Sequence, residues 1–249
     1  MKFLHCNAFV LGTALLISGQ AKDEKKEAKP ILPTVRVPRI NGPIQVDGKL
    51  DEETWERAPK LALKAADGDD RAVRRTEVRL LHDGARLYVA FHCEDPDIWT
   101  AHQGRDSHMW TEDVVEVFID IDDSEPGYVE LEVSPLGDLF DAIFFEPRKK
   151  VLMAWNPEIQ VEVSADGTVN RRGDTDRSWT VEMAIPAADL TPAPGVGRPG
   201  ADIQPAIPWR MNFYRNEKSD EREKGELQAW AAVRGDFHAT ALFGHVVFE

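Results

Sequence analysis

The sequence predicts an all-β fold, an antiparallel β-sandwich of the jelly-roll or immunoglobulin-like kind. From residue 35 onward, short runs rich in β-branched and aromatic residues alternate with turn-forming residues. No long amphipathic helical pattern separates the runs, which argues against parallel β-α-β units. The expected strands are 76–82, 86–93, 114–120, 128–133, 139–145, 159–163, 179–185, 210–214, 226–231 and 244–248.

The first 21 residues have the pattern of a secretory signal peptide. Lys2 precedes an apolar run over residues 8–17, and Ala21 ends a short segment of small and polar residues. The apolar run is too short to span a bilayer comfortably. We therefore expect an exported bacterial protein, periplasmic or extracellular and not inserted in a membrane. Residues 22–34 are expected to form a flexible linker, and residues 35–249 one domain.

Charge and cysteine content narrow the possible partners and compartments. The formal net charge is −14, which argues against a nucleic-acid partner. Cys6 would be removed with the signal peptide, so Cys93 would remain alone and form no intramolecular disulfide. An exported chain without disulfides fits a bacterial periplasm or surface better than a small disulfide-stapled scaffold.

Two features complete the expected architecture. One short N-terminal helix is predicted over residues 51–58, where Asp51 can cap the helix and Trp55 would face inward. Residues 191–208 contain five prolines and several glycines, so this segment should be a long loop outside the sheets.

The segment over residues 108–120 carries the strongest functional signal. Trp110 lies on a polar turn directly before the 114–120 strand, in which side chains alternate between two faces. Glu116 shares its face with Val114 and Phe118. An aromatic ring beside a fixed hydrogen-bond acceptor suits a sugar ring. The structural alternative has about equal weight: Trp110 closes the end of a core and Glu116 meets an internal arginine.

Other candidate sites are weaker. Asp120, Asp122 and Asp123 form an oxygen-rich turn that could hold a calcium ion or could be a plain acidic turn. The histidines show no metal-ligand spacing. A chain with 44 acidic residues always offers pairs of carboxylates, so glycosidic hydrolysis is possible but unsupported.

Taken together, these residues resemble the carbohydrate-binding module family 9 superfamily, which has DOMON-like relatives. The segment over residues 110–120 is similar to that family's most specific signature. The remaining matches lie in residues 47–51 with Trp55, Asp83 with 87–91 and Asp95, 179–186, 210–213 and 243–244. The resemblance covers residues 40–249 and implies a β-sandwich that holds a sugar between two aromatic rings, with calcium ions in structural roles.

The resemblance also implies roles for individual residues. Trp110 would be the first ring, Phe237 the second, Glu116 the hydroxyl acceptor and His238 a polar neighbour of the second ring. An arginine that binds sugar in the family falls near Glu132 in this chain, which makes the expected site more acidic. Arg215 is the candidate for supplying the missing donor.

These observations predict a non-catalytic, exported carbohydrate-binding domain that supports polysaccharide catabolism by binding an oligo- or polysaccharide. Two alternatives remain. Related sandwich domains hold haem b for electron transfer, and Met109, Met153 and Met211 are candidate axial ligands. Domains of this type also accompany glycosidases, so the chain could be a glycoside-hydrolysing component.

Overall fold

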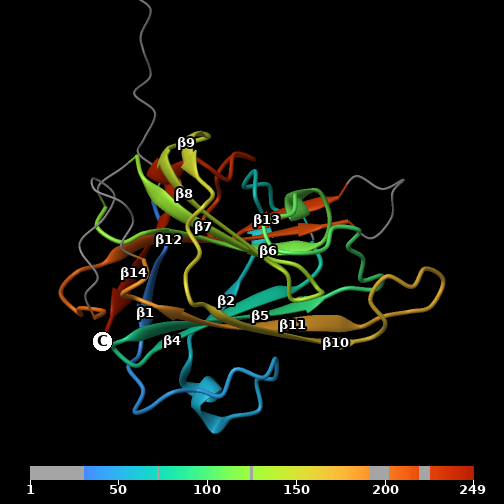
Figure 1. The fold of residues 1–249 in the computed structure, drawn as a ribbon, viewed down its shortest axis with the longest axis horizontal. Helices are drawn as coiled ribbons and strands as arrows, with labels where there is room; N and C mark the ends of the chain where they lie inside the picture. Colours follow the sequence, from blue (N-terminus) through green and yellow to red (C-terminus); the bar gives the residue numbers. More distant parts are fainter. Residues whose placement is uncertain (1–30, 72, 124–125, 191–201, 219–224) are drawn as a thin grey trace, which may run out of the picture. The chain divides into compact units, whose positions relative to one another are not determined.

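The computed structural model describes residues 31–71, 73–123, 126–190, 202–218 and 225–249. The described chain from Ile31 onward forms one unit built from two packed β-sheets, shown in Figure 1. The signal peptide predicted over residues 1–21 lies outside the described residues, as do residues 22–30 of the linker and 191–201 of the long loop.

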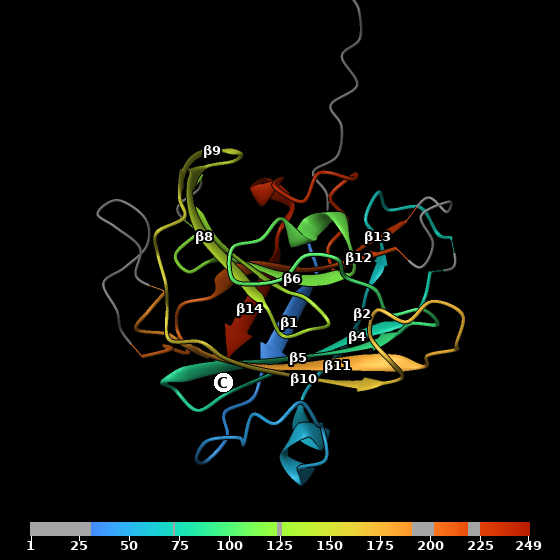
Figure 2. The same cartoon turned by 45° about the vertical axis from the view of Figure 1, so that its right-hand side comes forward.

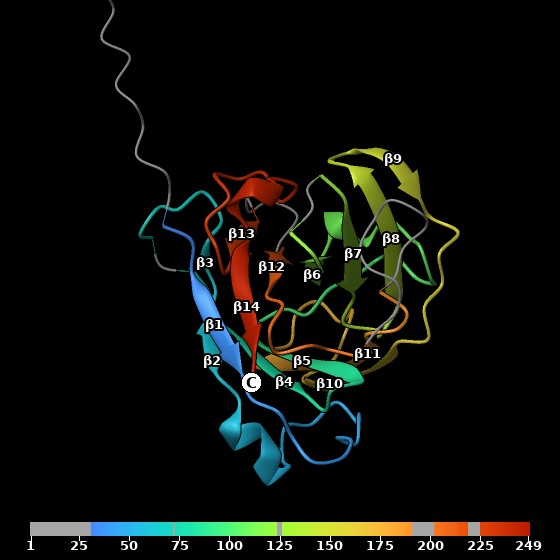
Figure 3. The ribbon, with the colours of Figure 1, turned by 90° about the vertical axis from the view of Figure 1, so that its left-hand side faces the viewer.

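The first sheet has nine strands in the described residues. Its order is β1 (Thr34–Val37), β14 (Gly244–Phe248), β12 (Trp209–Glu217), β6 (Val114–Asp120), β7 (Tyr128–Val133), β8 (Leu139–Glu146) and β9 (Lys149–Leu152), with β13 (Glu226–Ala229) pairing β12 and β3 (Lys64–Ala65) pairing β13. The strands pair antiparallel except β1 and β14, which run side by side in the same direction in Figure 3.

The second sheet has five antiparallel strands in the described residues. They follow the order β10 (Gln160–Asp166), β11 (Ser178–Pro186), β5 (Arg86–Glu94), β4 (Thr76–His82) and β2 (Lys60–Ala62). Figure 2 shows this sheet below the first, so the two form the layers of a sandwich. The predicted all-β sandwich is therefore confirmed.

Alternation along the strands builds the core between the sheets. Every second residue of β6 and β7 points inward, and so does every second residue of β5 and β11. These inward residues form one buried apolar cluster, which includes Val115, Val117, Ile119, Val129, Leu131, Val89, Phe91, Val181 and Met183. The outward-facing residues of the first sheet do not belong to this cluster and can contact other segments or a ligand.

The short N-terminal helix is present as a 3-10 helix, η1 (Glu53–Arg57). The prediction that Asp51 caps it is wrong, because Glu52 occupies the cap position and makes no side-chain cap hydrogen bond. Trp55 is buried as predicted, and its indole Nε1 donates to Glu182 Oε1 over 2.9 Å. Gly48 approaches β10 so closely that an added Cβ would lie 2.9 Å from the Val163 carbonyl carbon.

Several segments rise above the outer face of the first sheet. They are the 3-10 helix η2 (Met109–Thr111), the β8–β9 hairpin and the C-terminal loop with η3 (Thr240–Leu242), all visible above the upper layer in Figure 2. A second apolar cluster, including Phe118, Tyr128, Phe140, Tyr214 and Phe243, lies on this face. In the described part of the chain, no helix has the length and apolar character that crossing a bilayer requires.

Candidate functional site

A cavity of about 450 Å³ lies on the outer face of the first sheet, and we call it the outer cavity. Its floor comes from β6, β7, β8 and β12, and its walls come from η2, the β8–β9 hairpin and the loop before η3. The lining residues are Trp110, Glu116, Glu130, Glu132, Phe140, Phe144, Arg148, Val151, Met153, Asn216, Leu227, Gly235, Phe237 and His238. Five of the six predicted ligand-binding residues therefore lie around one space.

Strand register places the carboxylates on the floor of the outer cavity. Glu116 on β6 is the direct cross-strand partner of Glu132 on β7. Glu130 lies two residues before Glu132 and so points to the same face. One oxygen of each side chain lies within 4.8 Å of the others. We call Glu116, Glu130 and Glu132 the outer acidic triad.

The outer acidic triad is held in an environment that disfavours negative charge. All three residues are buried, and burial is the main reason that the pKa of each carboxyl is raised. Repulsion between neighbours adds to the effect of burial on Glu116 and Glu132, whose pKa values lie well above the ordinary range. Burial raises the pKa of Glu130 to about 7, and its interactions with Glu132 and with the Arg148 guanidinium partly offset the effect of burial.

Trp110 and Phe237 form two aromatic walls. The Trp110 side chain is 40% exposed, its ring contacts Phe140 at a centroid distance of 5.5 Å, and its carbonyl accepts a 2.6 Å hydrogen bond from Asn216 Nδ2. Phe237 is half-buried and stacks on Tyr214, with ring centroids 4.1 Å apart. The Tyr214 hydroxyl donates to the Phe237 carbonyl over 2.7 Å. Both rings are anchored and neither is sealed in the interior.

His238 links the second wall to the floor. Its Nδ1 contacts the Tyr128 hydroxyl and lies 3.8 Å from Glu130 Oε2. Burial, with a smaller contribution from Arg148, lowers the pKa of the imidazole to about 4. His238 is therefore neutral at neutral pH and does not balance the charge of the outer acidic triad.

Arg215 lies apart from the other predicted ligand-binding residues. It projects from the core-facing side of β12, the same face as Met211 and Phe213, and it does not line the outer cavity. Its guanidinium pairs with Asp95 over 2.9 Å, and both side chains are 0% exposed. The expectation that Arg215 supplies a sugar donor is not met, because it lies outside the outer cavity and its Nη1 and Nη2 groups donate to Asp95, Thr76 and the Glu94 carbonyl.

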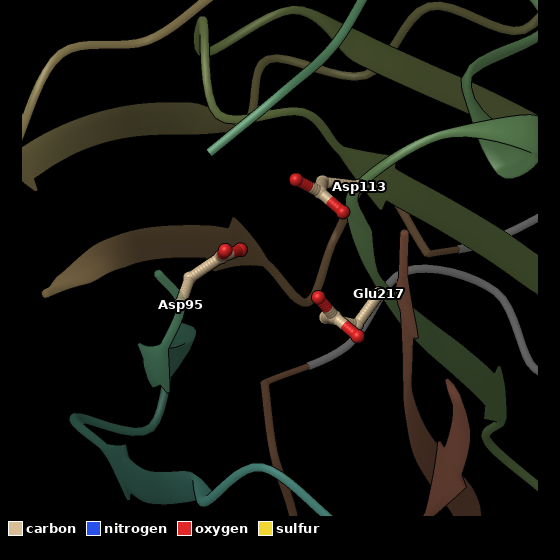
Figure 4. A group of neighbouring side chains, drawn as sticks. All are labelled: Asp95, Asp113 and Glu217. Carbon is tan, nitrogen blue, oxygen red and sulfur yellow. The ribbon is translucent and has the colours of Figure 1, made fainter. Parts of the chain in front are cut away.

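Asp95 belongs to a second acidic group, which we call the inner acidic triad: Asp95, Asp113 and Glu217. Figure 4 shows the three carboxylates directed toward one another. Unlike the outer acidic triad, the inner acidic triad accepts hydrogen bonds from backbone N–H groups and pairs with arginine side chains. Asp113 accepts from the backbone N–H groups of Trp99 and Lys218, each over 2.7 Å, and Glu217 pairs with Arg74 over 2.9 Å.

The acidic turn predicted to hold calcium has its own internal contacts. Asp120 Oδ1 accepts from the backbone N–H of Asp122, and Asp123 pairs with Arg210 over 2.9 Å. Among the described residues, the groups of three acidic side chains close enough to share an ion are the outer and inner triads. A calcium ion at Asp120, Asp122 and Asp123 stays a prediction.

Sequence reasoning missed part of the cavity. Glu130 could have been found, because it lies two residues from Glu132 on the same strand. Phe140, Phe144 and Asn216 follow the same alternation on β8 and β12, but their position in the same cavity as Trp110 depends on sheet pairing. Of the methionines considered as haem ligands, Met109 and Met211 are buried in apolar clusters, and Met153 lies at the cavity wall.

Comparisons with known proteins agree with this architecture. A Bacteroides uniformis ATCC 8492 protein proposed to bind carbohydrate superposes with a TM-score of 0.67 at 15% identity, covering 88% of this chain and 100% of that one. A carbohydrate binding module family 9 from Caldicellulosiruptor kristjanssonii in complex with cellotriose gives a TM-score of 0.58 at 16% identity, covering 87% and 93%. The glucose complex of a module from that organism gives 0.58 at 15%, covering 86% and 96%.

No curated protein matches the sequence. A family model does match, and it covers residues 46–249, which is most of the chain and includes every residue that lines the outer cavity. The chain therefore belongs to the carbohydrate family 9 binding domain-like family.

Proposed function

We propose that this protein binds a carbohydrate in the outer cavity and does not cleave it. One observation carries the proposal: Trp110 and Phe237, two anchored rings from separate loops, line the same cavity as the buried carboxylates. Aromatic faces bind the C–H face of a sugar ring, and carboxylates accept its hydroxyl protons. The family relationship and the sugar complexes of two structural neighbours support the proposal.

The placement of the carboxylates favours binding over hydrolysis. Glycosidases place two carboxyl groups on opposite sides of the scissile bond, roughly 5 to 9.5 Å apart. The outer acidic triad comes from adjacent strands of one sheet, with oxygens within 4.8 Å of one another, so all three approach a ligand from below. This arrangement can hold one polar group of a sugar.

The same floor disfavours the haem alternative. Haem b carries two propionates, and the described lining of the outer cavity gives them one arginine, Arg148, which is already paired with Asp236. Met153 and His238 both line the cavity, but the neighbouring Glu130, Glu132 and Glu116 make it a poor site for an anionic macrocycle. A reconstituted sample without a Soret band is the expected result.

Isothermal titration against a panel of mono- and oligosaccharides tests the sugar-binding proposal. Trp110→Ala should weaken binding at least about tenfold, since truncation of a stacked tryptophan commonly costs 2 kcal/mol or more. Trp99→Ala is the matched control, because Trp99 is a half-buried tryptophan that packs on Arg172 and does not line the outer cavity. Equal affinities for wild type and Trp110→Ala across the panel, or no binding to any sugar, would reject the proposal.

The proposal includes export and a supporting role in polysaccharide catabolism. The signal-peptide pattern over residues 1–21 supports export. Expression of the full chain in a bacterium, followed by fractionation and N-terminal sequencing, should give a mature protein that starts at Lys22. Retention of an uncleaved chain in the cytoplasm would contradict export.

A further inference from the structure

The floor of the outer cavity is acidic to a degree that a neutral sugar does not require. Glu116, Glu130 and Glu132 are 3%, 5% and 1% exposed. Two of their oxygens, Oε2 of Glu130 and Oε2 of Glu132, are buried without a hydrogen-bond partner among the described residues. Buried unpaired acceptors of this kind are costly, and their persistence calls for a ligand that supplies the missing donors.

No internal cation supplies those donors. Among residues 31–71, 73–123, 126–190, 202–218 and 225–249, no lysine or arginine lies within ion-pair distance of the outer acidic triad. Arg148 lines the cavity, but its guanidinium pairs with Asp236 over 2.6 Å. His238, at 3.8 Å from Glu130, is neutral at neutral pH. The described residues therefore leave the outer acidic triad without a cation in contact and open to one from a ligand.

The walls above the triad determine which cation fits. Trp110, Phe140, Phe144 and Phe237 surround the floor with aromatic surface, and such surface attracts organic cations through its negative ring faces. Calcium and magnesium ions need about six or more oxygen ligands. Besides the triad, the polar lining offers few further oxygens, the Asn216 amide among them, so a metal ion would be poorly coordinated.

An alkylammonium group matches the floor. It carries one positive charge and three N–H donors with no acceptor, and the triad offers one acceptor group from each of three carboxylates. Burial keeps the pKa values of all three carboxyls high, and repulsion adds to this for Glu116 and Glu132, so an arriving ammonium displaces a proton to solvent and restores the charged form.

We infer that the outer cavity selects sugars that carry a free amino group, so that the ammonium meets Glu116, Glu130 and Glu132 while the ring lies against Trp110 and Phe237. This inference rests on the proposed function and specifies its ligand class. It makes Glu132 a specificity-determining residue: an acidic residue at this position converts a site for hydroxyl groups into a site for an amine.

Three β-1,4-linked oligosaccharides of equal length test the inference, because they differ only at C2. Cello-oligomers carry a hydroxyl group there, chitin oligomers an acetamide, and fully deacetylated chitin oligomers an ammonium. Titration calorimetry with a metal chelator present should show the deacetylated oligomer binding wild type at least about tenfold more tightly than either neutral one. Proton release on binding, measured in buffers of different ionisation enthalpy, should accompany the amine alone.

Matched variants assign the preference to the triad. Glu132→Gln keeps the shape of the side chain and removes its charge, and it should reduce the preference to about threefold or less. Glu158→Gln is the control, because Glu158 is exposed and does not line the cavity, and it should keep the full preference. Glu116→Gln repeats the test if Glu132→Gln fails to fold.

The outcomes separate this inference from the proposed function. Equal affinity of wild type for all three oligomers would overturn the amine preference and leave sugar binding intact. A preference that survives in both Glu132→Gln and Glu116→Gln would also overturn it. Binding that appears only when calcium replaces the chelator, with no amine preference, would overturn it in favour of a metal-bridged sugar. Absence of binding to every oligomer and to the wider panel would instead reject the proposed function.

Discussion

The molecule contains two buried groups of three carboxylates, and they differ in what surrounds them. The inner acidic triad of Asp95, Asp113 and Glu217, drawn in Figure 4, also meets two arginine side chains and two backbone N–H groups, which that figure does not draw. The outer acidic triad has no arginine or lysine within ion-pair distance in the described residues, and it opens to a cavity. Burial of acidic residues alone therefore does not indicate a binding site, whereas burial without internal donors does.

The same sheet produces both groups, because its strands have two faces. Residues 213 and 215 of β12 point toward the core, where Arg215 joins β12 to Asp95 after β5. Residues 214 and 216 of the same strand point toward the outer cavity. The core-facing side of the sheet thus holds the two sheets together, and the outer side is available for a ligand.

The largest predicted effect concerns the inner group. Arg215→Met should lower the free energy of unfolding by about 3 to 5 kcal/mol, because it leaves Asp95 buried beside Asp113 and Glu217 without its cation. Urea denaturation measures the loss. Adding Asp95→Asn should recover part of it, since the uncompensated charge is then removed.

The same variant tests whether Arg215 has a structural role and no role in sugar binding. At a temperature where Arg215→Met is folded, its sugar affinity should match that of wild type, because Arg215 does not line the outer cavity. A selective loss of sugar affinity in a folded variant of normal stability would instead show that Arg215 contributes to sugar binding. That result would contradict the contrast drawn between the inner and the outer acidic triad.

A second prediction concerns the pH dependence of stability in the outer group. Burial raises the pKa of Glu130 from 4.5 to about 7, so the native state holds this proton to a higher pH than the unfolded chain does. Between these values the native state binds more protons, and the free energy of unfolding falls as pH rises. Glu130 faces Glu132 and Glu116 from the sheet, and Arg148 and His238 from the walls.

Replacing Glu130 by glutamine isolates this contribution. Glu130→Gln should match wild type at about pH 3, where the carboxyl is protonated in both states, and should be more stable near pH 8 by on the order of 3 kcal/mol. Thermal or urea unfolding across this pH range measures the difference, with the exposed Glu158→Gln as control. Parallel curves for wild type and Glu130→Gln would show that Glu130 ionises normally in the folded protein.

Much of the fold could be predicted from local patterns. The strands predicted over residues 76–82, 114–120, 128–133 and 244–248 have the bounds found in the structure. Alternation and turn residues define such strands locally. The parallel pairing of β1 with β14 depends on contacts between the two ends of the domain, and no local pattern encodes it.

The candidate site was predictable to a smaller extent. Strand alternation puts Glu116 and Glu132 on the face opposite to the apolar residues directly before and after each of them in the sequence. The family pattern indicates Trp110 and Phe237. Alternation also puts Arg215 on the same face as Met211 and Phe213, which predicts a position in the core. Whether a buried carboxylate has an internal donor depends on side chains from distant segments, so the contrast between the two triads required the structure.

The smallest predicted effect comes from the rim of the outer cavity. Arg148 is largely exposed and pairs with Asp236, so Arg148→Ala should change the free energy of unfolding by less than about 1 kcal/mol. Arg148 also places a positive charge in the cavity wall, where it opposes a second cation. Its removal should therefore strengthen binding of the deacetylated chitin oligomer by about two- to threefold, leave the cello-oligomer unchanged, and lose this effect at high salt. Calorimetry at two salt concentrations measures the affinities of both oligomers. Weaker binding of the cello-oligomer to Arg148→Ala would show instead that the guanidinium donates to a sugar hydroxyl.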